Sequence, residues 1–254
     1  KLFNQGMILG ISHRDENGRF YSPQDVEYRD GKPYAKDTQT LLSAREEKMS
    51  KSRLNVVNPD DVVAEYGADS LRLYEMFMGP LEATKPWNMN GVEGVYRFLA
   101  RVWRMIIDDR AEHNTLLEAV KDIPASQETL RMLHHTIKRV TDDLEHYRFN
   151  TAISAMMEFT NFLTPVADKP KSVLKTFVQL LAPFAPHLAE ELWIAMGLPD
   201  GTCALQAFPL FDESILQEST YDYPISFNGK MRFKQTFDLS LNEKEIVDFI
   251  VALP

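Results

Sequence analysis

A run of apolar residues at helical spacing limits the possible folds more than any other feature of this sequence. Between Glu93 and Asp109, apolar residues recur every three or four positions, at Val95, Phe98, Val102, Met105 and Ile106. They share one face of an α-helix, and that face must be buried against other elements. Further helices are predicted over 126–147, 150–164, 171–182 and 187–196, with a proline break before the last. Short connections favour antiparallel neighbours, so residues 85–197 are predicted to form an up-and-down bundle.

The segments on either side of the predicted bundle have different residue patterns. Residues 1–47 carry turn signals at 16–19 and 29–32, which predict small hairpins or loops. A polar cap and a proline at 58–60 predict a short helix that ends at Gly67, followed by a second helix over 69–78. Near the C-terminus, alternating residues around Asn228-Gly229 predict a hairpin, and Ser240 with Glu243 forms a capping box before a helix over 246–253.

These elements predict a mainly α chain in three parts. A mixed α/β part over 1–80 precedes an antiparallel helical bundle over 81–213, and a truncated ββα module over 220–254 comes last. Because the sequence opens without a methionine and stops directly after a helix-like run, both ends look cut. We therefore expect a piece of a longer protein.

Charge and composition exclude several classes of protein. The net charge of −9 argues against a protein that coats nucleic acid indiscriminately, because neutralising phosphates takes a surplus of Lys and Arg. Cys203 is the only cysteine, which excludes a disulfide framework or a cysteine-based zinc site and fits a reducing compartment. No run approaches the roughly 18 apolar residues of a membrane span, and no signal peptide opens the chain. We expect a soluble, cytoplasmic protein without a membrane partner.

One short polar segment has the composition of a phosphate-binding loop. Lys48-Met49-Ser50-Lys51-Ser52 carries two ammonium groups and two hydroxyls. Lysine is a compact charge on a flexible stem, so it can follow phosphate oxygens as charge develops on them. The helix start at 58–60 anchors one end, and residues 42–54 are expected to move as a lid. On composition alone, the favoured alternative is a solvated charge cluster with Glu46, Glu47 and Arg53.

Two basic surfaces are candidates for RNA contact. Arg97, Arg101 and Arg104 lie at i, i+4 and i+7, so they share a narrow arc opposite the apolar face and can grip successive phosphates. The alternative is an ordinary solvated face, with Asp108 and Asp109 on the next turn. Lys230 and Arg232 belong to a basic hairpin with interleaved aromatics. The alternative there is an outer strand kept soluble by its charges.

The tryptophans and histidines are assigned structural roles. Trp87 and Trp103 are predicted to belong to the core rather than to stack on bases. His134-His135 is not predicted to bind metal, because adjacent helical side chains diverge and no third ligand lies at useful spacing. His187 is expected to cap or pack near the Pro186 break, and no protein-bound metal is predicted.

Several of these segments resemble the class I aminoacyl-tRNA synthetases. Lys48–Ser52 is identical to the second signature of that class, and Asn55–Pro59 and Tyr66–Arg72 resemble the segments next to that signature. Leu181–Trp193 is similar to the tRNA-binding bundle of the Leu, Ile, Val and Met subgroup. Trp87–Leu99 and Phe227–Arg232 resemble the leucyl members in particular. The resemblance spans nearly the whole chain, and only residues 12–47 match loosely.

The resemblance implies an activity, a fold and site residues. Residues 1–80 would end a Rossmann-like catalytic domain, 81–213 would form a bundle of the class Ia anticodon-binding type, and 220–254 would begin the C-terminal domain. The implied reaction is activation of leucine by ATP, with magnesium as counter-ion, and transfer to tRNA(Leu), in an enzyme expected to be monomeric. Lys51 would contact ATP directly and Lys48 would assist. Arg97 and Arg101 match positions at which leucyl enzymes meet tRNA.

Departures from the family pattern limit what this chain can do alone. The first signature of the class I synthetases, His-Ile-Gly-His, is absent from this sequence, and so is the proofreading insertion. The isolated chain is therefore predicted to be inactive. Two alternatives stay open: a free-standing RNA-binding or scaffold module, and an isoleucyl, valyl or methionyl enzyme, against which the hairpin at Asn228-Gly229-Lys230 argues.

Overall fold

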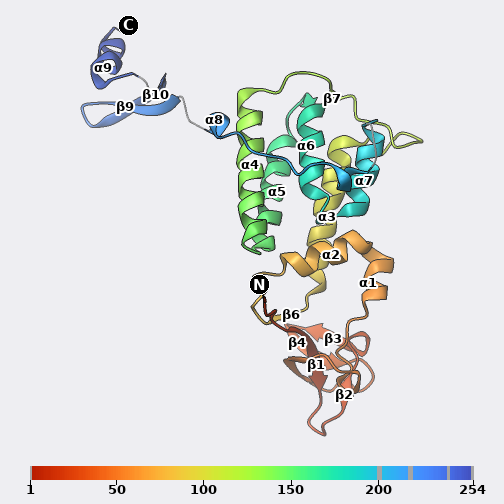
Figure 1. Ribbon diagram of the computed structural model, residues 1–254. Helices are drawn as coiled ribbons and strands as arrows, with labels where there is room; N and C mark the ends of the chain where they lie inside the picture. Colours follow the sequence, from red (N-terminus) through yellow and green to blue (C-terminus); the bar gives the residue numbers. More distant parts are fainter. Residues whose placement is uncertain (1, 199–201, 217–219, 239–240, 253–254) are drawn as a thin grey trace.

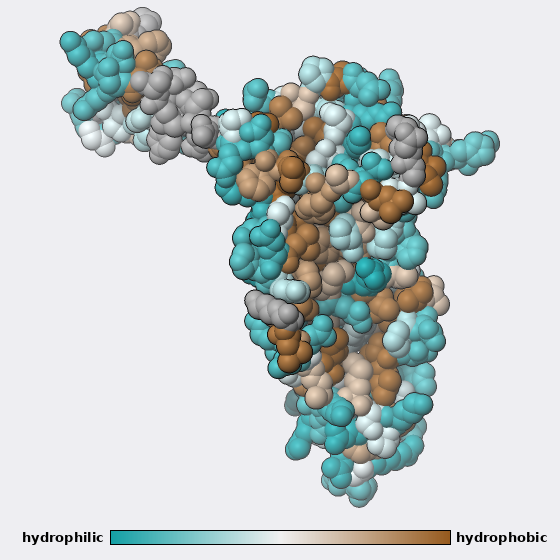
Figure 2. Space-filling view, viewed as in Figure 1, coloured by the Kyte–Doolittle hydropathy of each residue, from teal (hydrophilic) through white to brown (hydrophobic). Residues whose placement is uncertain are grey.

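The computed structural model describes residues 2–198, 202–216, 220–238 and 241–252. Figure 1 shows strands at one end of the molecule, helices in the middle, and a hairpin with a final helix that lies apart from the other helices. In Figure 2, hydrophilic residues dominate the end formed by the N-terminal strands, and hydrophobic residues gather over the middle of the same face. Among the described residues, no helix is both long and apolar enough to cross a membrane.

The N-terminal strands form a small sheet around β1 (Ile8–Arg14). β2 (Phe20–Tyr21) and β5 (Ser43–Lys48) pair with β1 antiparallel, and β6 (Lys85–Pro86) pairs with it in parallel. After the turn η1 (Pro23–Asp25), β3 (Val26–Arg29) and β4 (Lys32–Ala35) form a separate hairpin. Asp30 and Gly31 both have positive φ there, 49° and 76°, as a tight two-residue hairpin turn requires. Both predicted hairpins are confirmed.

Two short helices lead from the sheet to the helical region. α1 (Pro59–Tyr66) starts at the predicted cap, where the Asn58 side chain accepts a hydrogen bond from Asp60 N, and it ends at Gly67, whose φ is 86°. α2 (Ala68–Phe77) comes directly after it. The proline at the first helical position and the glycine at the end explain why both boundaries could be predicted.

The helical region comprises α3 to α7 and contains the main hydrophobic core (Figure 1). Its helices are α3 (Met89–Ile106), α4 (Gln127–Glu145), α5 (Phe149–Leu163), α6 (Lys171–Leu181) and α7 (Pro186–Ala195). The four helices α4 to α7 agree with the predicted ranges to within a residue or two. The short elements around them are β7 (Val120–Lys121), β8 (Lys169–Pro170), η3 (Cys203–Leu205) and α8 (Glu213–Leu216). The largest fully buried side chains are Trp193, Phe98, Phe159, Phe177 and Phe184.

The boundaries of α3 differ from the predicted 93–109. The helix begins four residues earlier, because the Asn88 side chain accepts a hydrogen bond from Asn90 N at 2.9 Å and caps it there. It ends at Ile106, and the buried, extended Ile107 forms a bridge to Leu116. Asp108 and Asp109 therefore lie beyond the helix, and their placement on its next turn was wrong.

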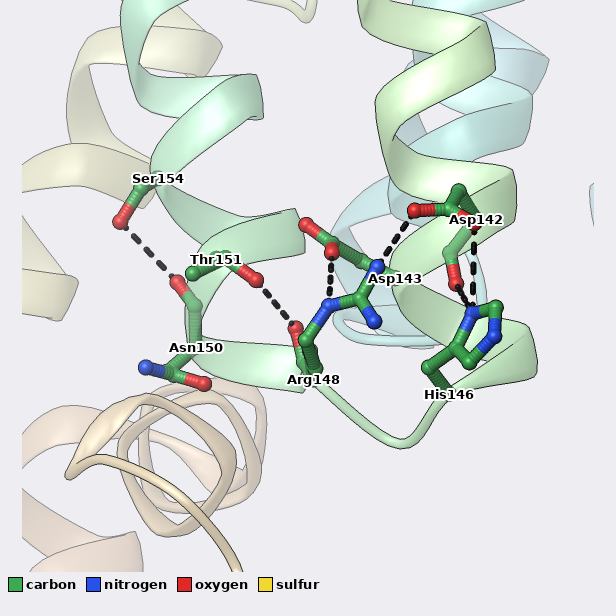
Figure 3. Close-up of polar contacts among 7 residues, drawn as sticks. All are labelled: Asp142, Asp143, His146, Arg148, Asn150, Thr151 and Ser154. Carbon is green, nitrogen blue, oxygen red and sulfur yellow. Dashed lines mark hydrogen bonds and ion pairs between the residues drawn. The ribbon is translucent and has the colours of Figure 1, made fainter.

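A polar corner joins α4 to α5 (Figure 3). The Arg148 guanidinium lies between two carboxylates of α4, donating from Nε to Asp143 at 2.7 Å and from its terminal nitrogen to Asp142. Tyr147, the residue before Arg148, has a φ of 59° and stacks on Phe3 with ring centroids 5.3 Å apart. The corner thus holds the N-terminal segment against the helical region.

The C-terminal unit consists of β9 (Thr220–Phe227), β10 (Lys230–Asp238) and α9 (Glu243–Val251). The predicted hairpin is present, with Asn228 and Gly229 in its turn at φ 52° and 74°. The predicted capping box was wrong by two residues. Asn242 accepts from Glu245 N at 3.1 Å and donates its own N–H to the Glu245 carboxylate at 2.8 Å, whereas Ser240 lies outside the described residues. Residues 199–201 also lie outside them.

Candidate functional site

The segment Lys48–Ser52 lies at the junction of the sheet and α1. Lys48 is the last residue of β5, and Lys51 opens the turn η2 (Lys51–Arg53). Leu54 ends this turn with a φ of 55°. The Ser50 and Ser52 hydroxyls lie 2.9 Å apart and are hydrogen-bonded. The segment is therefore a compact turn that presents two hydroxyl groups side by side.

The buried side chain of Asn55 holds the backbone of this turn in place. Its Oδ1 accepts a hydrogen bond from Ser50 N at 2.8 Å, and its Nδ2 donates to Ser12 Oγ at 2.9 Å. Weaker contacts of 3.4 Å join the same Nδ2 to the carbonyls of Gly10 and Lys48. Asn55 is only 2% exposed, so these bonds are shielded from water.

The sheet and the turn approach each other most closely at Gly10. A Cβ placed on Gly10 would lie 2.2 Å from the Asn55 carbonyl oxygen, so only glycine allows this contact. Sequence reasoning gave no role to Asn55 or Gly10. The one local signal was that Asn55, a polar residue, directly follows the turn. Its role becomes visible only when Ser12 is placed on the neighbouring strand.

Both lysines of the turn are available to a ligand. Lys48 and Lys51 are exposed, and in the part of the chain that the structure describes neither has an ion-pair partner. Arg53, by contrast, lies 3.4 Å from Glu47. The turn thus offers two uncompensated cations and two hydroxyls on a backbone that is already ordered. Such a group favours an anion with several oxygens.

The expectation that residues 42–54 move freely was wrong for its first half. Residues 43–48 form β5, which pairs with β1 from Leu9–Lys48 to Arg14–Ser43, and Leu42 is buried. β5 escaped prediction because its sequence, Ser-Ala-Arg-Glu-Glu-Lys, has no alternating apolar pattern. Any lid motion is therefore confined to the turn after Lys48.

The three arginines of α3 are all exposed. Arg97 lies 3.7 Å from Glu93, and Arg101 donates to the Asn161 Oδ1 of α5 at 3.0 Å. Arg104 lines a groove between α3 and α7. The three therefore project from one helix, as expected, and only weak solvent-exposed contacts compete with a phosphate for the first two.

The cationic residues of the C-terminal hairpin form a second surface. Lys230 and Arg232 are exposed on β10, which has a bulge between Met231 and Phe233. Figure 1 places this hairpin away from α3, so the two basic surfaces do not form one patch within the chain. The Phe227 side chain, also assigned to the basic hairpin, lies outside the described residues.

The two tryptophans were predicted to lie in the core, but both are only partly buried at its edge. Trp87 contacts Tyr74 edge-to-face with ring centroids 4.9 Å apart, and Trp103 donates from Nε1 to Asp109 at 2.8 Å. Both are partly buried against the main core.

His134 and His187 each have a hydrogen-bond partner. His134 Nδ1 accepts from Asp212 N at 2.8 Å, and His187 Nδ1 lies 2.8 Å from the Asp69 carboxylate. Within the described ranges, no three His, Cys, Asp or Glu side chains are arranged to hold a metal ion.

Asp69 is a structural residue that sequence reasoning missed. Its carboxylate, on α2, accepts hydrogen bonds from the Leu188 and His187 N–H groups at 2.7 and 3.4 Å, so it caps the start of α7. Arg72, one turn further along α2, donates to the Pro183 carbonyl at 3.2 Å. α2 thereby joins the part of the chain that carries the lysine turn to the break between α6 and α7.

Two family models match the chain. The anticodon-binding domain of tRNA ligase matches residues 126–247, and tRNA synthetases class I (I, L, M and V) matches residues 25–85. The first includes α4 to α8 and most of the C-terminal unit, and the second includes the turn Lys48–Ser52 together with α1 and α2.

Curated relatives match over most of the chain. A leucine–tRNA ligase 1 of Rhizobium johnstonii is 50% identical over 92% of the chain and 27% of its own length. A leucine–tRNA ligase of Rhodopirellula baltica is 44% identical over all of the chain and 30% of its own length. The chain therefore spans less than a third of these relatives.

A solved structure has a similar fold. The ternary complex of LeuRS, tRNA and LeuAMS from Agrobacterium radiobacter matches with a TM-score of 0.65 and 30% identity. The match covers all of this chain and 29% of that one.

Proposed function

The chain belongs to the leucine–tRNA ligases, and we propose that it contributes an ATP-phosphate loop and a tRNA-binding surface to a complete enzyme of this family. The reaction of that enzyme is the ATP-dependent activation of leucine, with subsequent transfer to tRNA(Leu). The relatives described above all carry the leucine–tRNA ligase or LeuRS name, which disfavours an isoleucyl, valyl or methionyl enzyme or a free-standing scaffold.

The observation that carries the ATP role is the pair of exposed lysines without ion-pair partners in the described chain, on an ordered turn. Lys51 contacts the phosphates of ATP and Lys48 assists, while Ser50 and Ser52 donate further hydrogen bonds. As leucine attacks the α-phosphate, negative charge moves onto the departing pyrophosphate, and ammonium groups at fixed positions stabilise that charge. Magnesium would accompany ATP as its counter-ion and would supply further positive charge beside the phosphates.

The same residues give this proposal its test. In a complete enzyme that contains this segment, Lys51→Ala should reduce leucine-dependent exchange of pyrophosphate into ATP by about 100-fold, as expected for loss of one group that stabilises transition-state charge. The control is Lys32→Ala, because Lys32 is also exposed but lies on β4. Equal activity of both variants would exclude the proposed role of Lys51.

The isolated chain should not catalyse this reaction. It lacks the first of the two signatures of the class I synthetases, which helps hold the nucleotide. A turn with two lysines cannot by itself position ATP and leucine. Leucine-dependent pyrophosphate exchange by the purified 254-residue chain would contradict this expectation.

Binding of tRNA(Leu) is assigned to two surfaces. Arg97, Arg101 and Arg104 contact the RNA backbone from α3, and Lys230 with Arg232 contacts it from β10. The double variant Arg97→Glu with Arg101→Glu should weaken tRNA binding. The plot of the logarithm of the association constant against the logarithm of the salt concentration should become less steep by about two, roughly one for each phosphate that is no longer neutralised. A matched charge reversal at Lys32 and Lys36 on the β4 side is the control. Equal affinity and slope in both double variants would remove α3 from the interface.

The proposed division of the chain is consistent with these roles. Residues 1–80 end a Rossmann-like catalytic domain, 81–213 form an antiparallel bundle of the anticodon-binding type, and 220–254 begin a C-terminal α/β module. The enzyme is proposed to act in the cytoplasm as a monomer. Size-exclusion chromatography with light scattering tests the last point.

A further inference from the structure

A groove of about 490 Å³ opens where α1, α2, α3 and α7 meet, outside the turn Lys48–Ser52. Figure 1 shows α1 and α7 on the same side of the molecule, with α2 and α3 beside them. Its volume lies within the range of about 300–1,000 Å³ that is typical of small-ligand sites. Of its lining residues, Arg104 has been assigned to RNA contact and Asp69 to the cap of α7, but the cavity itself has no assigned ligand.

Aromatic side chains form much of its wall. Tyr66 of α1 and Tyr96 of α3 meet edge-to-face, with ring centroids 5.7 Å apart, and Tyr96 is 45% exposed. Trp103, one of the lining residues, is fixed by its hydrogen bond to Asp109 at 2.8 Å. Leu99 lies between them on α3 and is 6% exposed. The groove therefore offers rigid aromatic surface to the solvent, which is suited to stacking a planar ring.

One guanidinium group belongs to the rim of the groove. Arg104 lines it and, in the described part of the chain, has neither an ion pair nor a hydrogen bond. Arg101 and Arg97 precede it on α3, about 10 Å from end to end at a rise of about 1.5 Å per residue, but they do not line the groove. The lining also includes the carboxylates of Asp69 and Asp109. Arg104 is therefore the lining group that can hold an anion, such as a phosphate of a nucleic acid strand.

We propose that the groove receives one unstacked base of bound tRNA, stacked on Tyr96 beside Trp103, with an adjoining phosphate on Arg104. This inference rests on the proposed binding of tRNA along α3. Aromatic stacking combined with a cationic track is the recognition chemistry of single-stranded nucleotides. An apolar peptide would use the aromatic wall and leave the Arg104 guanidinium unused.

A carboxylate at the rim adds a hydrogen-bond acceptor. Asp109 takes one hydrogen bond from Trp103 and has further acceptor positions. All four bases present at least one N–H donor on their pairing edges. The carboxylate can therefore hold a base by its pairing edge without selecting among the four.

Two variants of one residue test the stacking. In the 254-residue chain, Tyr96→Ala should weaken binding of a tRNA(Leu) transcript by about 10-fold, within the range for removal of one base–aromatic stack. Tyr96→Phe keeps the ring and should bind within about 2-fold of the parent. Since Tyr96 is nearly half exposed, neither change removes core packing.

Base-selective chemical probing locates the occupant. One base of the transcript should be protected by the parent chain and by Tyr96→Phe, and should become reactive in the complex with Tyr96→Ala. Replacing that nucleotide by an abasic residue should weaken binding by the parent chain and leave binding by Tyr96→Ala unchanged.

Failure of the groove and failure of the proposed function give different results. If the parent and both variants bind the transcript equally, and no base loses protection, the groove proposal is wrong while tRNA binding stands. If Tyr96→Phe weakens binding as much as Tyr96→Ala, stacking is refuted. If the parent chain does not bind the transcript at all, the proposed tRNA role and the groove proposal both fall.

Discussion

Replacing Asn55 with alanine should release the turn Lys48–Ser52 without unfolding the protein. The Asn55 side chain makes two good hydrogen bonds, with Ser50 N at 2.8 Å and with Ser12 Oγ at 2.9 Å. Alanine removes both hydrogen bonds at once and leaves the Ser50 N–H without its acceptor. The hydroxyl pair of Ser50 and Ser52 remains, but it joins two residues of the turn to each other and does not tie the turn to the sheet.

The size of the effect can be worked out from these contacts. Each hydrogen bond contributes about 1 kcal/mol net, so the closed state of the turn should be destabilised by about 2 kcal/mol. A change of about 2 kcal/mol corresponds to about a 30-fold change in an equilibrium constant. The two contacts at 3.4 Å are too long to add much.

Amide hydrogen exchange measures this opening directly. The Ser50 N–H should exchange about 30-fold faster in Asn55→Ala than in the parent chain, because exchange from a locally opened state depends on the free energy of opening. Asn58→Ala is the control. It removes the cap of α1, which costs about 1 kcal/mol, and should leave the Ser50 N–H unchanged.

One result would refute the reasoning. If Ser50 exchanges at the parent rate in Asn55→Ala while urea denaturation shows a lower free energy of unfolding, the side chain stabilises the fold but does not hold the turn. In a complete enzyme, the same variant should then retain pyrophosphate exchange.

Three further predictions concern stability. Gly91→Ala should lower the free energy of unfolding by about 1–3 kcal/mol, because the new Cβ would lie 2.3 Å from the buried Tyr74 ring. Gly94→Ala, whose Cβ would have nothing within 4 Å, should instead stabilise α3 by up to about 1 kcal/mol. Urea denaturation compares the two variants. Asp69→Ala should cost about 2 kcal/mol and speed amide exchange in the first turn of α7, and unchanged exchange there would exclude the capping role. Burial lowers the pKa of His13 from its ordinary value of 6.5, so the unfolded chain binds the proton more readily. The stability that neutral His13 contributes should be fully present above pH 6.5 and should fall as the pH decreases below that value. His13→Gln should flatten that part of the plot of unfolding free energy against pH.

The helices could be predicted because their signals are local. Apolar residues three and four apart define one face of α3, and the same spacing gives the ranges of α4 to α6. Caps such as Asn58 and breakers such as Gly67 act on neighbouring residues, so they too are visible in sequence. The start of α3 was missed because its cap, Asn88, precedes a stretch without apolar periodicity.

The candidate phosphate loop was predictable only in composition. Two lysines and two serines within five residues indicate an affinity for phosphate, and the resemblance to class I synthetases supplied the assignment. Neither could reveal that Lys48 ends a strand, because β5 is polar on both faces and is defined by its partner β1. Strand pairing depends on a distant segment, which a local pattern does not contain.

The sequence by itself determined the helical segments, the tight turns and the chemical character of the loop, since each depends on residues a few positions apart. Only the tertiary structure decided which groups meet. Asn55 reaches Ser12 on another strand, Asp69 caps a helix that starts more than a hundred residues later, and Tyr66 meets Tyr96 in the groove. These contacts depend on how elements pack in three dimensions, and hydrogen bonds and aromatic pairs of that kind leave no periodic trace along the chain.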